Sequence, residues 1–388
     1  MQDRVVIVGG GVMGAATACF LARDHGRAVT VIERDPSYRR ASSALSASSI
    51  RQQFSQPINI QLSQWSLQFL RRVGDELAVD GQPPTIGLVE PGYLFLAGAA
   101  GVDALRHNHR TQREQGADVA LLQPPELHQR FDWLNCADVA LASLGLSGEG
   151  WFDGPALMQA FRRKAVHAGA RFVSAEAVGF DVHGARVRAV RCSDGAVSTA
   201  DQVVLAAGAW VAPLAAQLGC KLPVVGRKRD VFVFDSPAVL PACPLVVDAS
   251  GLWFRPEGCG YICGAPPRGG DPDEAALESI DLAQFEEQLW PALAHRVPGF
   301  EALRLRSAWA GYYEMNTFDQ NGLAGALPGW DNLFTACGFS GHGMQQAPAV
   351  GRALAALMTG GRTDAPSLEP LSPQRLLQGR ALLECNVI

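Results

Sequence analysis

Several features that would place the chain in a particular class are missing from it. No apolar run is long enough to span a bilayer, so a transmembrane protein is not expected. The formal net charge is -5 and no cluster of basic residues resembles a nucleic-acid footprint, so nucleic acid is not an expected partner. The nine cysteines form no C-x-x-C pair and show no His/Cys spacing typical of metal ligands. We therefore expect no metal site and expect the cysteines to be reduced and structural.

The chain also lacks internal repeats, low-complexity tracts and an apparent leader. The first apolar strand begins within a few residues of Met1, which leaves no room for a signal or transit peptide and predicts a cytoplasmic location. At 388 residues, the chain is long enough for about two domains with a large buried core.

The amino-terminal segment combines a strand, a glycine turn, a helix and a second strand. Residues Arg4–Val8 are a short apolar strand, Gly9–Gly14 read G-x-G-x-x-G, and Ala15–Arg23 continue as a helix. The second strand, Ala28–Ile32, is followed at once by Glu33. This order is typical of a dinucleotide-binding unit, whereas a glycine-rich loop in an unrelated α/β protein is the alternative.

Each special residue of this unit has a physical role. Gly9 permits the tight turn, Gly11 lets the backbone approach a pyrophosphate, and Gly14 lets the helix lie close to the sheet. The helix N-terminus then favours negative charge. Glu33 is placed to accept hydrogen bonds from ribose hydroxyls.

The sequence after Glu33 decides which dinucleotide is expected. An NAD domain would continue with further β-α-β units, but here a serine-rich stretch follows, Ser42–Ser49, which does not read as a strand. A helix is expected from about Pro57 to Val73. The remaining parts of the dinucleotide fold return much later, and such interruption indicates FAD.

The fold returns in two separate pieces. In the first, Asp153 caps a helix that runs to about His167, Ala170–Val178 form a strand, and the strand Asp201–Leu205 ends in a small-residue turn. In the second, the strand Asn332–Ala336 leads into the loop Cys337–Gln346 and a helix over about Ala347–Met358. The N-H groups and the helix dipole at this loop are suited to an electron-rich ring edge.

Four motifs carry a family resemblance over nearly the whole chain. They are Ser-Ile-Arg-Gln-Gln-Phe at 49–54, Trp-Ala-Gly-Tyr-Tyr-Glu at 309–314, Asn-Thr-Phe-Asp-Gln-Asn-Gly at 316–322 and Gly-Phe-Ser-Gly-His-Gly-Met-Gln-Gln-Ala-Pro at 338–348. With them the chain resembles the D-amino-acid oxidase-like (DAO) superfamily of FAD-dependent amine oxidoreductases. The branch is that of sarcosine oxidase, glycine oxidase and dimethylglycine dehydrogenase, and the motifs are most similar to FAD-dependent oxidoreductase domain-containing proteins.

The resemblance and the interruptions together imply a two-domain α/β fold. An interrupted Rossmann-like FAD-binding domain is expected over residues 1–85, 150–223 and 322–388, and an antiparallel-sheet substrate domain over residues 86–149 and 224–321. Within the second domain we expect a helix at about Leu282–His295 and strands in five runs. These runs are Gly87–Leu96, Arg229–Phe234, Leu245–Val247, Gly251–Arg255 and Gly260–Gly264. The flavin ring should lie between the domains.

The resemblance implies removal of a hydride from the carbon next to an amine nitrogen, delivered to flavin N5, giving an imine. Arg51 occupies the place of the arginine that holds the substrate carboxylate in sarcosine oxidase-like enzymes; a surface or phosphate-contacting arginine is the alternative. The loop around His342 is expected to stabilise negative charge on the reduced flavin, or His342 is a packing residue. Tyr312 and Tyr313 would close the cavity or contact the substrate, although either could be a core tyrosine. Trp253, Arg255 and Tyr261 are weaker candidates.

Some positions depart from the pattern of these relatives. Tyr312 stands where sarcosine oxidases carry the cysteine that bonds flavin, so non-covalent FAD is expected. Gln345 replaces a lysine that helps to bind carboxylate, and Ile262 stands where those oxidases carry the lysine thought to activate oxygen. Oxygen and another electron acceptor therefore both remain open as the oxidant. The carboxylate-binding arginine that glycine oxidases carry near Tyr313 is absent, so glycine is not an expected substrate.

Two sets of candidate residues follow, together with two alternative functions. The candidate catalytic residues are Arg51, His342, Tyr312, Tyr313 and Gln345. The candidate FAD-binding residues are Gly9, Gly11, Val12, Met13, Gly14, Glu33, Arg34, Ser42, Ser43, Ser49, Val178, Ala207, Gly208, Trp210, Gly338, Gly341, His342, Gly343, Met344 and Gln345. The partner expected at this site is a small-molecule amine or amino acid. The alternatives are an FAD-dependent 2-hydroxy-acid dehydrogenase and a non-catalytic flavoprotein assembly factor.

Overall fold

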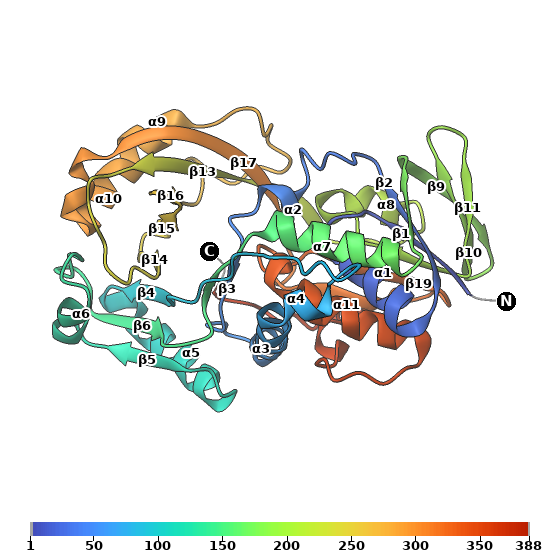
Figure 1. Ribbon diagram of the computed structural model, residues 1–388, viewed down its shortest axis with the longest axis horizontal. Coiled ribbons are helices and arrows are strands. Elements are labelled where there is room, and N and C mark those ends of the chain that lie inside the picture. Colours follow the sequence, from blue (N-terminus) through green and yellow to red (C-terminus); the bar gives the residue numbers. More distant parts are fainter. Residues whose placement is uncertain (1–2, 387–388) are drawn as a thin grey trace.

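The computed structural model describes residues 3–386, and the strands within that range form four sheets (Figure 1). The six-stranded sheet has the order β18-β19-β12-β1-β2-β8 and is parallel except for β18, which pairs antiparallel with β19. Its strands are β1 (Arg4–Val8), β2 (Ala28–Glu33), β8 (Arg171–Ser174), β12 (Gln202–Leu205), β18 (Leu323–Ala326) and β19 (Leu333–Cys337). Segments from three distant parts of the sequence thus build one sheet.

Both faces of this sheet are covered, which explains why β1 is apolar from Val5 to Val8. Val5 and Ile7 belong to the core shared with the helices on one face. Val6 and Val8 belong to the core on the other face, under α8 and the three-stranded sheet. A parallel strand buried on both faces reads as a continuous hydrophobic run rather than as an alternation. This is why residues 4–8 identify the strand so clearly in the sequence.

Helices on one face of the six-stranded sheet pack against one another as well as against the strands. The long helices α1, α7 and α11 form this layer together with α3, as the close blue, green and red ribbons show (Figure 1). Ala18 and Gly351 are part of the close packing between these helices, since a Cβ on Gly351 would lie 2.8 Å from that of Ala16. The helices on or beside this sheet are α1 (Val12–His25), α2 (Ser42–Leu45), α3 (Pro57–Arg71), α4 (Val73–Glu76), α7 (Gly154–His167), α8 (Val211–Ala216), α11 (Gly343–Thr359) and α12 (Gln374–Leu377), with η2 (Gly208–Trp210) and η5 (Glu369–Leu371).

The two small sheets lie beside the six-stranded one. The three-stranded sheet is a meander of antiparallel strands, and the two-stranded sheet joins the serine-rich segment to the strand before α7. Their strands are β9 (Ala177–His183), β10 (Arg186–Cys192) and β11 (Val197–Thr199), and β3 (Ser49–Ile50) with β7 (Gly150–Trp151).

An eight-stranded sheet with the order β17-β13-β16-β15-β14-β4-β6-β5 forms the second lobe. All its pairings are antiparallel except β14 with β4, which is parallel. Its strands are β4 (Tyr93–Ala97), β5 (Val119–Leu122), β6 (Leu141–Gly145), β13 (Val224–Asp235), β14 (Leu245–Val247), β15 (Trp253–Glu257), β16 (Gly260–Gly264) and β17 (Arg304–Asn316). The helices of this lobe are α5 (Val102–Glu114), α6 (Pro124–Arg130), α9 (Leu282–Gln284) and α10 (Trp290–Arg296), with η1 (Ala99–Gly101), a π turn η3 (Phe285–Leu289) and η4 (Pro298–Ala302).

An aromatic core holds the second lobe together. Phe232, Phe234 and Phe254 on the strands pack with Phe285 and Phe300 from the covering helical segments. Phe234 and Phe300 meet edge to face with their centroids 5.1 Å apart. Large aromatic side chains bury much apolar area each, so these few residues dominate the cohesion of this lobe.

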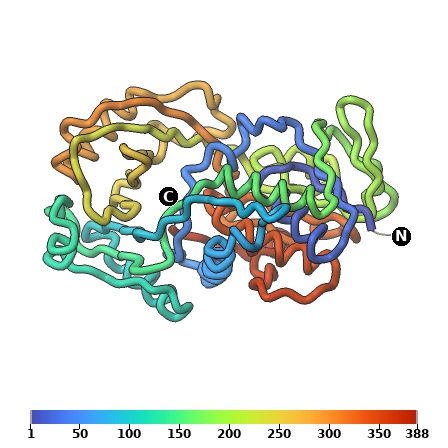
Figure 2. Tube along the Cα trace, in the orientation of Figure 1, coloured from blue at the N-terminus to red at the C-terminus, as the bar shows by residue number. Residues whose placement is uncertain are grey.

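The paired strands β13 and β17 connect the eight-stranded sheet to the six-stranded one. They pair from Val224–Asn316 to Asp235–Arg304, with one register shift between Val233 and Phe234, and run toward α2 (Figure 1). At the inner end, the N-H of Ser340 donates to the carbonyl oxygen of Glu314 at 3.1 Å, which joins β17 to the loop before α11. The tube in Figure 2 shows the same convergence, with carboxyl-terminal red segments lying among amino-terminal blue ones.

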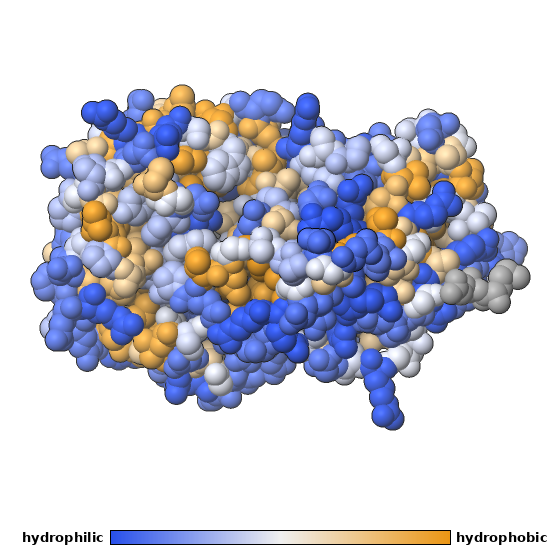
Figure 3. All heavy atoms as spheres, viewed as in Figure 1, coloured by the Kyte–Doolittle hydropathy of each residue, from blue (hydrophilic) through white to orange (hydrophobic). Residues whose placement is uncertain are grey.

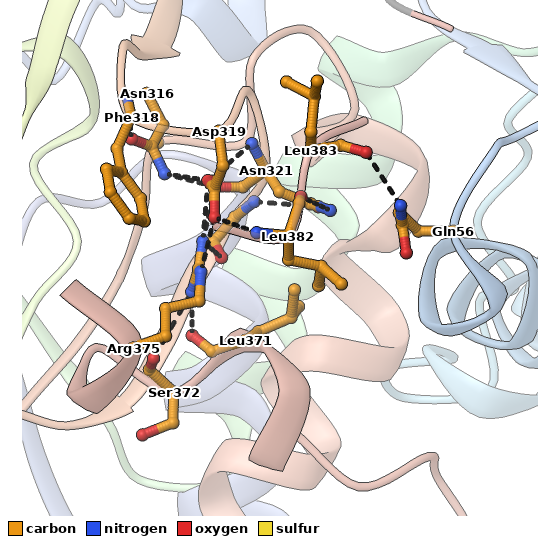
Figure 4. Close-up of polar contacts among 12 residues, drawn as sticks. Gln56, Asn316, Phe318, Asp319, Asn321, Leu371, Ser372, Arg375, Leu382 and Leu383 are labelled. Atoms are coloured by element: carbon orange, nitrogen blue, oxygen red, sulfur yellow. Dashed lines mark hydrogen bonds and ion pairs between the residues drawn. The ribbon is translucent and has the colours of Figure 1, made fainter. Parts of the chain in front are cut away.

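The carboxyl-terminal segment is fixed by a buried polar cluster (Figure 4). Asp319 accepts from Arg375 Nε at 2.7 Å and from the backbone N-H of Leu382 at 3.0 Å. Asn321 donates to the carbonyl oxygen of Leu382 at 3.1 Å, and Gln56 donates to that of Leu383 at 2.8 Å. The segment after α12 therefore crosses from the 316–322 turn to the start of α3.

Several of the expected elements differ in extent. The expected helix Leu282–His295 is divided into α9, the π turn η3 and α10, and the expected strand Gly251–Arg255 is β15, Trp253–Glu257. The expected strand Gly87–Leu96 begins only at Tyr93, because Pro91 has no N-H and Gly92 adopts a φ of 104°. The expected strand Ala170–Val178 is wrong as one element: β8 ends at Ser174, and the chain turns into β9 of another sheet. The helix expected from Ala347, α11, begins earlier, at Gly343, and contains Pro348.

The antiparallel lobe and the interrupted parallel sheet were both expected, and the fold class is confirmed. The exact domain boundaries stay a prediction. On the face shown in Figure 3, polar side chains are interspersed with small apolar patches. Among residues 3–386, no helix has the length and apolar character needed to cross a membrane.

Candidate functional site

The glycine turn after β1 is closed by contacts that only glycine allows. Gly9 has a φ of 103°, and a Cβ there would lie 2.3 Å from the carbonyl oxygen of Ala206. A Cβ on Gly14 would lie 1.9 Å from the carbonyl oxygen of Gly9. Gly11 precedes α1, whose first turn carries no acidic residue and no side-chain cap. Free backbone N-H groups at a helix start, approached closely by a glycine turn, fit a phosphate group.

The acidic residue at the end of β2 lies beside this turn. Glu33 accepts from the backbone N-H of Gly10 at 2.7 Å and from that of Asp35 at 2.9 Å. Its carboxylate faces the same cavity as the glycine turn, which is compatible with the ribose contact expected from the sequence. Arg34, the next residue, stacks on Trp210 with 4.0 Å between its guanidinium carbon and the ring centroid.

Serines of the segment after β2 form the opposite wall. The hydroxyl of Ser43 accepts from the N-H of Val12 at 2.9 Å, so α2 is held directly over the start of α1. Ser42 and Ser49 also line the cavity. Because of this contact between Ser43 and Val12, the segment does not continue the sheet but folds over the glycine turn.

The carboxyl-terminal loop supplies the other end of the cavity. Gly338, Ser340 and Gly341 have φ values of 70°, 51° and 91°, which turns the chain sharply between β19 and α11. Gly341, Gly343 and Met344 line the cavity, whereas Gly338 packs against Val224 and Asn316 behind it.

His342 is buried with no hydrogen-bond partner on either ring nitrogen among the described residues. Its ring meets Phe54 edge to face, with 5.0 Å between centroids. Burial, assisted by the nearby Arg51, holds the pKa of His342 well below its usual value, so the imidazole is neutral. An orphaned buried imidazole beside a cavity indicates that a group outside the chain completes its hydrogen bonding.

Arg51 lies close to this histidine, but its guanidinium is already engaged. It donates to the carbonyl oxygens of Gln53 and Asn386, and its guanidinium carbon lies 4.2 Å from the centroid of Phe54. Its backbone N-H donates to Gln345 Oε1 at 2.8 Å. Arg51 is 2 % exposed and does not line the cavity. Burial lowers its pKa, opposed by Tyr93 and the carboxylates around it.

A buried glutamate, Glu149, holds the backbone next to Arg51. Glu149 accepts from the backbone N-H groups of Gln52 at 2.6 Å and Gln53 at 3.1 Å, and from Gln53 Nε2 at 2.8 Å. Desolvation raises the pKa of Glu149 to about 7, although these donors and Arg51 act in the other direction. Glu149 thereby fixes the backbone on which Arg51 is mounted.

Consecutive residues of β17 face different parts of the site. The hydroxyl of Tyr312 donates to the carbonyl oxygen of Ala275 at 2.8 Å, and its ring meets Trp210 edge to face. Tyr313 packs on Gly341, where an added Cβ would lie 2.7 Å from its ring. Burial raises the pKa of Tyr313, which Arg229 and Arg51 partly oppose.

Glu314 follows these tyrosines and was missed in the sequence. Its side chain lines the cavity and accepts from the N-H of Phe339 at 3.4 Å. Burial raises the pKa of Glu314 to about 7, against the effect of the N-H groups of Phe339 and Gly338. A lone carboxyl group directly after the two tyrosines is the only signal that could have indicated it.

One cavity of about 430 Å³ brings most of the candidates together. Its lining includes the candidate residues Gly9, Gly11, Val12, Met13, Glu33, Arg34, Ser42, Ser43, Ser49, Ala207, Gly208, Trp210, Tyr312, Tyr313, Gly341, Gly343 and Met344. Six candidates lie outside the lining: Gly14, Arg51, Val178, Gly338, His342 and Gln345. Val178 is 47 % exposed, and its neighbour Ala177 lines the cavity instead.

Further lining residues come from the eight-stranded sheet. Arg229 on β13 and Trp253 on β15 reach the same cavity as the glycine turn. Of the weaker candidates, Trp253 is therefore at the cavity, whereas Arg255 and Tyr261 are not among its lining residues. Arg255 donates to the carbonyl oxygen of the lining residue Ala47, and Tyr261 donates to that of Ala238. No cysteine is among the described lining residues, and residues 3–386 contain no group of three or more potential metal ligands.

Fold and cavity together define a flavoprotein oxidoreductase, and a comparison with protein families agrees. A profile described as FAD dependent oxidoreductase, DAO, matches residues 4–357. The chain belongs to this family, and its cofactor is FAD.

Individual relatives extend over almost the full length. The chain is 43 % identical to FAD-dependent oxidoreductase domain-containing protein 1 of Xenopus laevis, covering 99 % of this chain and 84 % of the relative. It is 29 % identical to glycine oxidase of Pseudomonas aeruginosa, covering 93 % and 96 %. The solved structure of L-proline dehydrogenase from P. horikoshii is similar with a TM-score of 0.85 and 26 % identity, covering 98 % and 99 %.

Proposed function

We propose that this FAD-dependent oxidoreductase oxidises a small amine or amino acid at the carbon next to nitrogen. When bound, FAD supplies the redox chemistry by accepting a hydride at N5, which leaves an imine. One observation carries the proposal: a single cavity extends from the glycine turn at Gly9–Gly14 to the aromatic side chains Tyr313 and Trp253 of the second lobe. The cavity thus offers a nucleotide cradle at one end and an apolar, partly charged chamber at the other.

The chain's own residues would orient the two reactants. Backbone N-H groups at the start of α1 would bind the pyrophosphate, and Glu33 would hold the ribose. The loop Gly341–Met344 and the start of α11 would present donors to the pyrimidine edge of the flavin ring. His342, neutral and without partners, would supply one further hydrogen bond from behind this loop.

The relatives support an amine as the substrate class but do not identify the individual amine. Glycine oxidase and L-proline dehydrogenase are, by their names, enzymes that oxidise a primary and a cyclic secondary amino acid. We propose the same class of donor, a CH-NH or CH-NH2 group, for this chain. We further propose that FAD is held without a covalent bond, since Tyr312 stands at the position expected for an attachment residue and no cysteine is among the described lining residues.

An anaerobic titration tests the reaction. The yellow holoprotein is mixed with a panel of primary, N-methylated and cyclic amino acids, and bleaching of the flavin absorbance identifies the donor. Admission of air then measures how fast the colour returns, which is rapid for an oxidase and slow for a dehydrogenase. Flavin that no amine bleaches would contradict the proposal.

A 2-hydroxy acid is the second candidate. Such a donor needs a base near the ring, and Glu314, whose pKa burial raises to about 7, lines the cavity. The same titration with 2-hydroxy acids separates the two classes. If neither class bleaches the flavin and the protein copurifies with one large partner, the non-catalytic assembly role becomes the better explanation.

Arg51 remains a predicted contact for the substrate carboxylate. Its guanidinium would have to exchange a backbone carbonyl for that carboxylate. Arg51→Ala should therefore raise the KM for a carboxylated amine by tenfold or more, since a charged hydrogen-bonded pair is lost. Arg110→Ala, on the exposed face of α5, should leave KM unchanged.

A further inference from the structure

A second arginine reaches the cavity from β13. Arg229 pairs with Gly311 of β17 in the strand register and lines the cavity close to Tyr313. The distance from its guanidinium carbon to the centroid of the Tyr313 ring is 5.2 Å. Since Tyr313 packs on Gly341 of the carboxyl-terminal loop, Arg229 lies at the end of the cavity where that loop is found.

The planar fork of Arg229 already holds a carboxylate. Its two terminal nitrogens each donate to one oxygen of Asp271 at 2.8 Å, in a bidentate pair. This is the geometry in which arginine recognises a carboxylate ligand. Asp271 belongs to the segment between β16 and α9, directly after Gly269 and Gly270.

Two glycines with positive φ precede Asp271 on this segment. Gly269 and Gly270 have φ values of 69° and 119°, and a Cβ on either would meet nothing within 4 Å. The Asp271 side chain is 33 % exposed, whereas that of Arg229 is 17 % exposed. The arginine is thus fixed by the sheet and its aromatic neighbour. The loop that carries Asp271 is held by the pair Arg227–Asp273 and by the N-H of Glu274, which donates to the carbonyl oxygen of Gly226 at 2.7 Å, and Asp271 is the more exposed partner of Arg229.

The two arginines near Tyr313 differ in what they can offer a ligand. The guanidinium of Arg51 donates to backbone carbonyls and lies outside the cavity lining. Arg229 lines the cavity. It donates to the carbonyl oxygen of Lys228 and also holds a carboxylate, which another carboxylate can replace without loss of hydrogen bonds. Exchange of like for like costs less than breaking the buried contacts of Arg51.

We propose that Arg229 is the primary anchor for the substrate carboxylate, and that Asp271 occupies this position until the substrate displaces it. The inference deepens the proposed function, because it names a carboxylated amine as the substrate class. The loop of residues 266–275, which carries Asp271, would then cover this end of the cavity and move away when the substrate binds. Tyr313 and Trp253 would flank the bound carbon chain.

The test uses a non-reactive carboxylate, so that it does not depend on turnover. The FAD-loaded protein is titrated with benzoate, and the change in the flavin absorption spectrum gives a Kd; benzamide is the uncharged comparison. Wild type should bind benzoate with saturation, and benzamide at least tenfold more weakly. Arg229→Gln should weaken benzoate at least thirtyfold, with a smaller loss in Arg229→Lys.

A matched control lies two residues earlier on the same strand. Arg227 pairs with Asp273 of the same loop at 2.9 Å but does not line the cavity. Arg227→Gln should not weaken benzoate relative to wild type, since it frees the loop without touching the anchor. Asp271→Asn should tighten benzoate several-fold, because the internal competitor loses its charge.

The outcomes separate this inference from the proposed function. Flavin that amines fail to bleach, with benzoate still bound through Arg229, contradicts the reaction but retains the anchor. Absence of benzoate binding to wild type, or equal Kd values for wild type and Arg229→Gln, overturns the anchor. Loss of binding in Arg51→Ala with retention in Arg229→Gln would assign the carboxylate to Arg51 and overturn it as well.

Discussion

At the scale of single residues, the site depends on glycines, which have no side chain. Gly14 illustrates this, because an added Cβ would overlap the carbonyl oxygen of Gly9 at 1.9 Å. No rotation relieves a clash between two backbone positions, so either the turn opens or α1 moves away from β1. The cofactor cradle is therefore more sensitive here than at any exposed glycine.

Gly14→Ala should yield protein with little bound FAD. The ratio of flavin to protein absorbance after purification measures this, with circular dichroism as the check on folding. Gly74→Ala in α4 is the matched control, since its Cβ would meet its nearest neighbour at an ordinary 3.6 Å. Full yellow colour in both variants would contradict the role of the turn.

Glu149 is a titrating residue whose burial has a measurable consequence. Its pKa in the folded protein is about 7, compared with 4.5 for a free carboxyl group. Between these values the folded state binds more protons than the unfolded state. The contribution of Glu149 to the free energy of unfolding is therefore greatest below about pH 4.5 and is lost as the pH rises through 7.

Glu149→Gln should remove this dependence. The free energy of unfolding of wild type, relative to the variant, should fall by on the order of 2 to 3 kcal/mol between pH 5 and pH 8. Urea denaturation of both proteins across this range gives the difference directly, and all other groups cancel. A difference that does not change with pH, or that rises, would contradict the raised pKa.

At the scale of elements, the carboxyl-terminal segment is secured by the buried pair Arg375–Asp319. The two side chains are 6 % and 0 % exposed, and the segment also covers Arg51 through the carbonyl of Asn386. Removing one partner of a buried pair leaves an uncompensated charge, which costs about 3 to 5 kcal/mol.

Arg375→Met should therefore destabilise the protein by about 3 to 5 kcal/mol. The exposed pair Arg71–Glu90 provides the comparison, and Arg71→Met should cost no more than about 1 kcal/mol. Thermal or urea unfolding of the two variants checks the contrast. Equal losses would mean that the buried cluster does not fasten the segment.

The elements also show what the sequence could predict. The unit from β1 to Glu33 is contiguous, so its pattern could be interpreted locally, and β14 and β16 match their expected bounds. The long strand β17 was not assigned, and neither was the pairing of β5 with β6, because such pairings join distant segments. The serine-rich segment lies outside the six-stranded sheet, as expected, but its last residue, Ser49, enters the short strand β3, and its contact with α1 was not foreseeable.

The same reason explains what was missed at the site. Arg229 reaches the cavity only through the register between β13 and β17, which no local pattern specifies. A signal was present: Arg227–Asp230 are four consecutive charged residues inside an otherwise apolar strand. Charge in such a place indicates partners supplied by other elements.

At the scale of the whole molecule, the cavity is lined from both sheets, so FAD would bridge the two lobes. A ligand that binds only the folded chain raises its stability by about 2.7 kcal/mol at a hundredfold excess over Kd. Removal of the flavin should therefore lower the Tm, and added FAD should restore it.

FMN should restore the Tm only weakly, because it lacks the adenosine half for which Glu33 and the glycine turn are placed. Differential scanning fluorimetry of the flavin-free protein with FAD, FMN or ADP makes the comparison. If FMN stabilised as well as FAD, the nucleotide end of the cavity would contribute nothing.

The residues that line the cavity are far apart in the sequence, and this has a consequence for synthesis at the ribosome. The cavity walls begin at Val8 and are completed by Met344, and the last backbone carbonyl on Arg51 comes from Asn386. A nascent polypeptide therefore cannot close this cavity before Met344 has been synthesised, and termination ahead of that residue would release a colourless product.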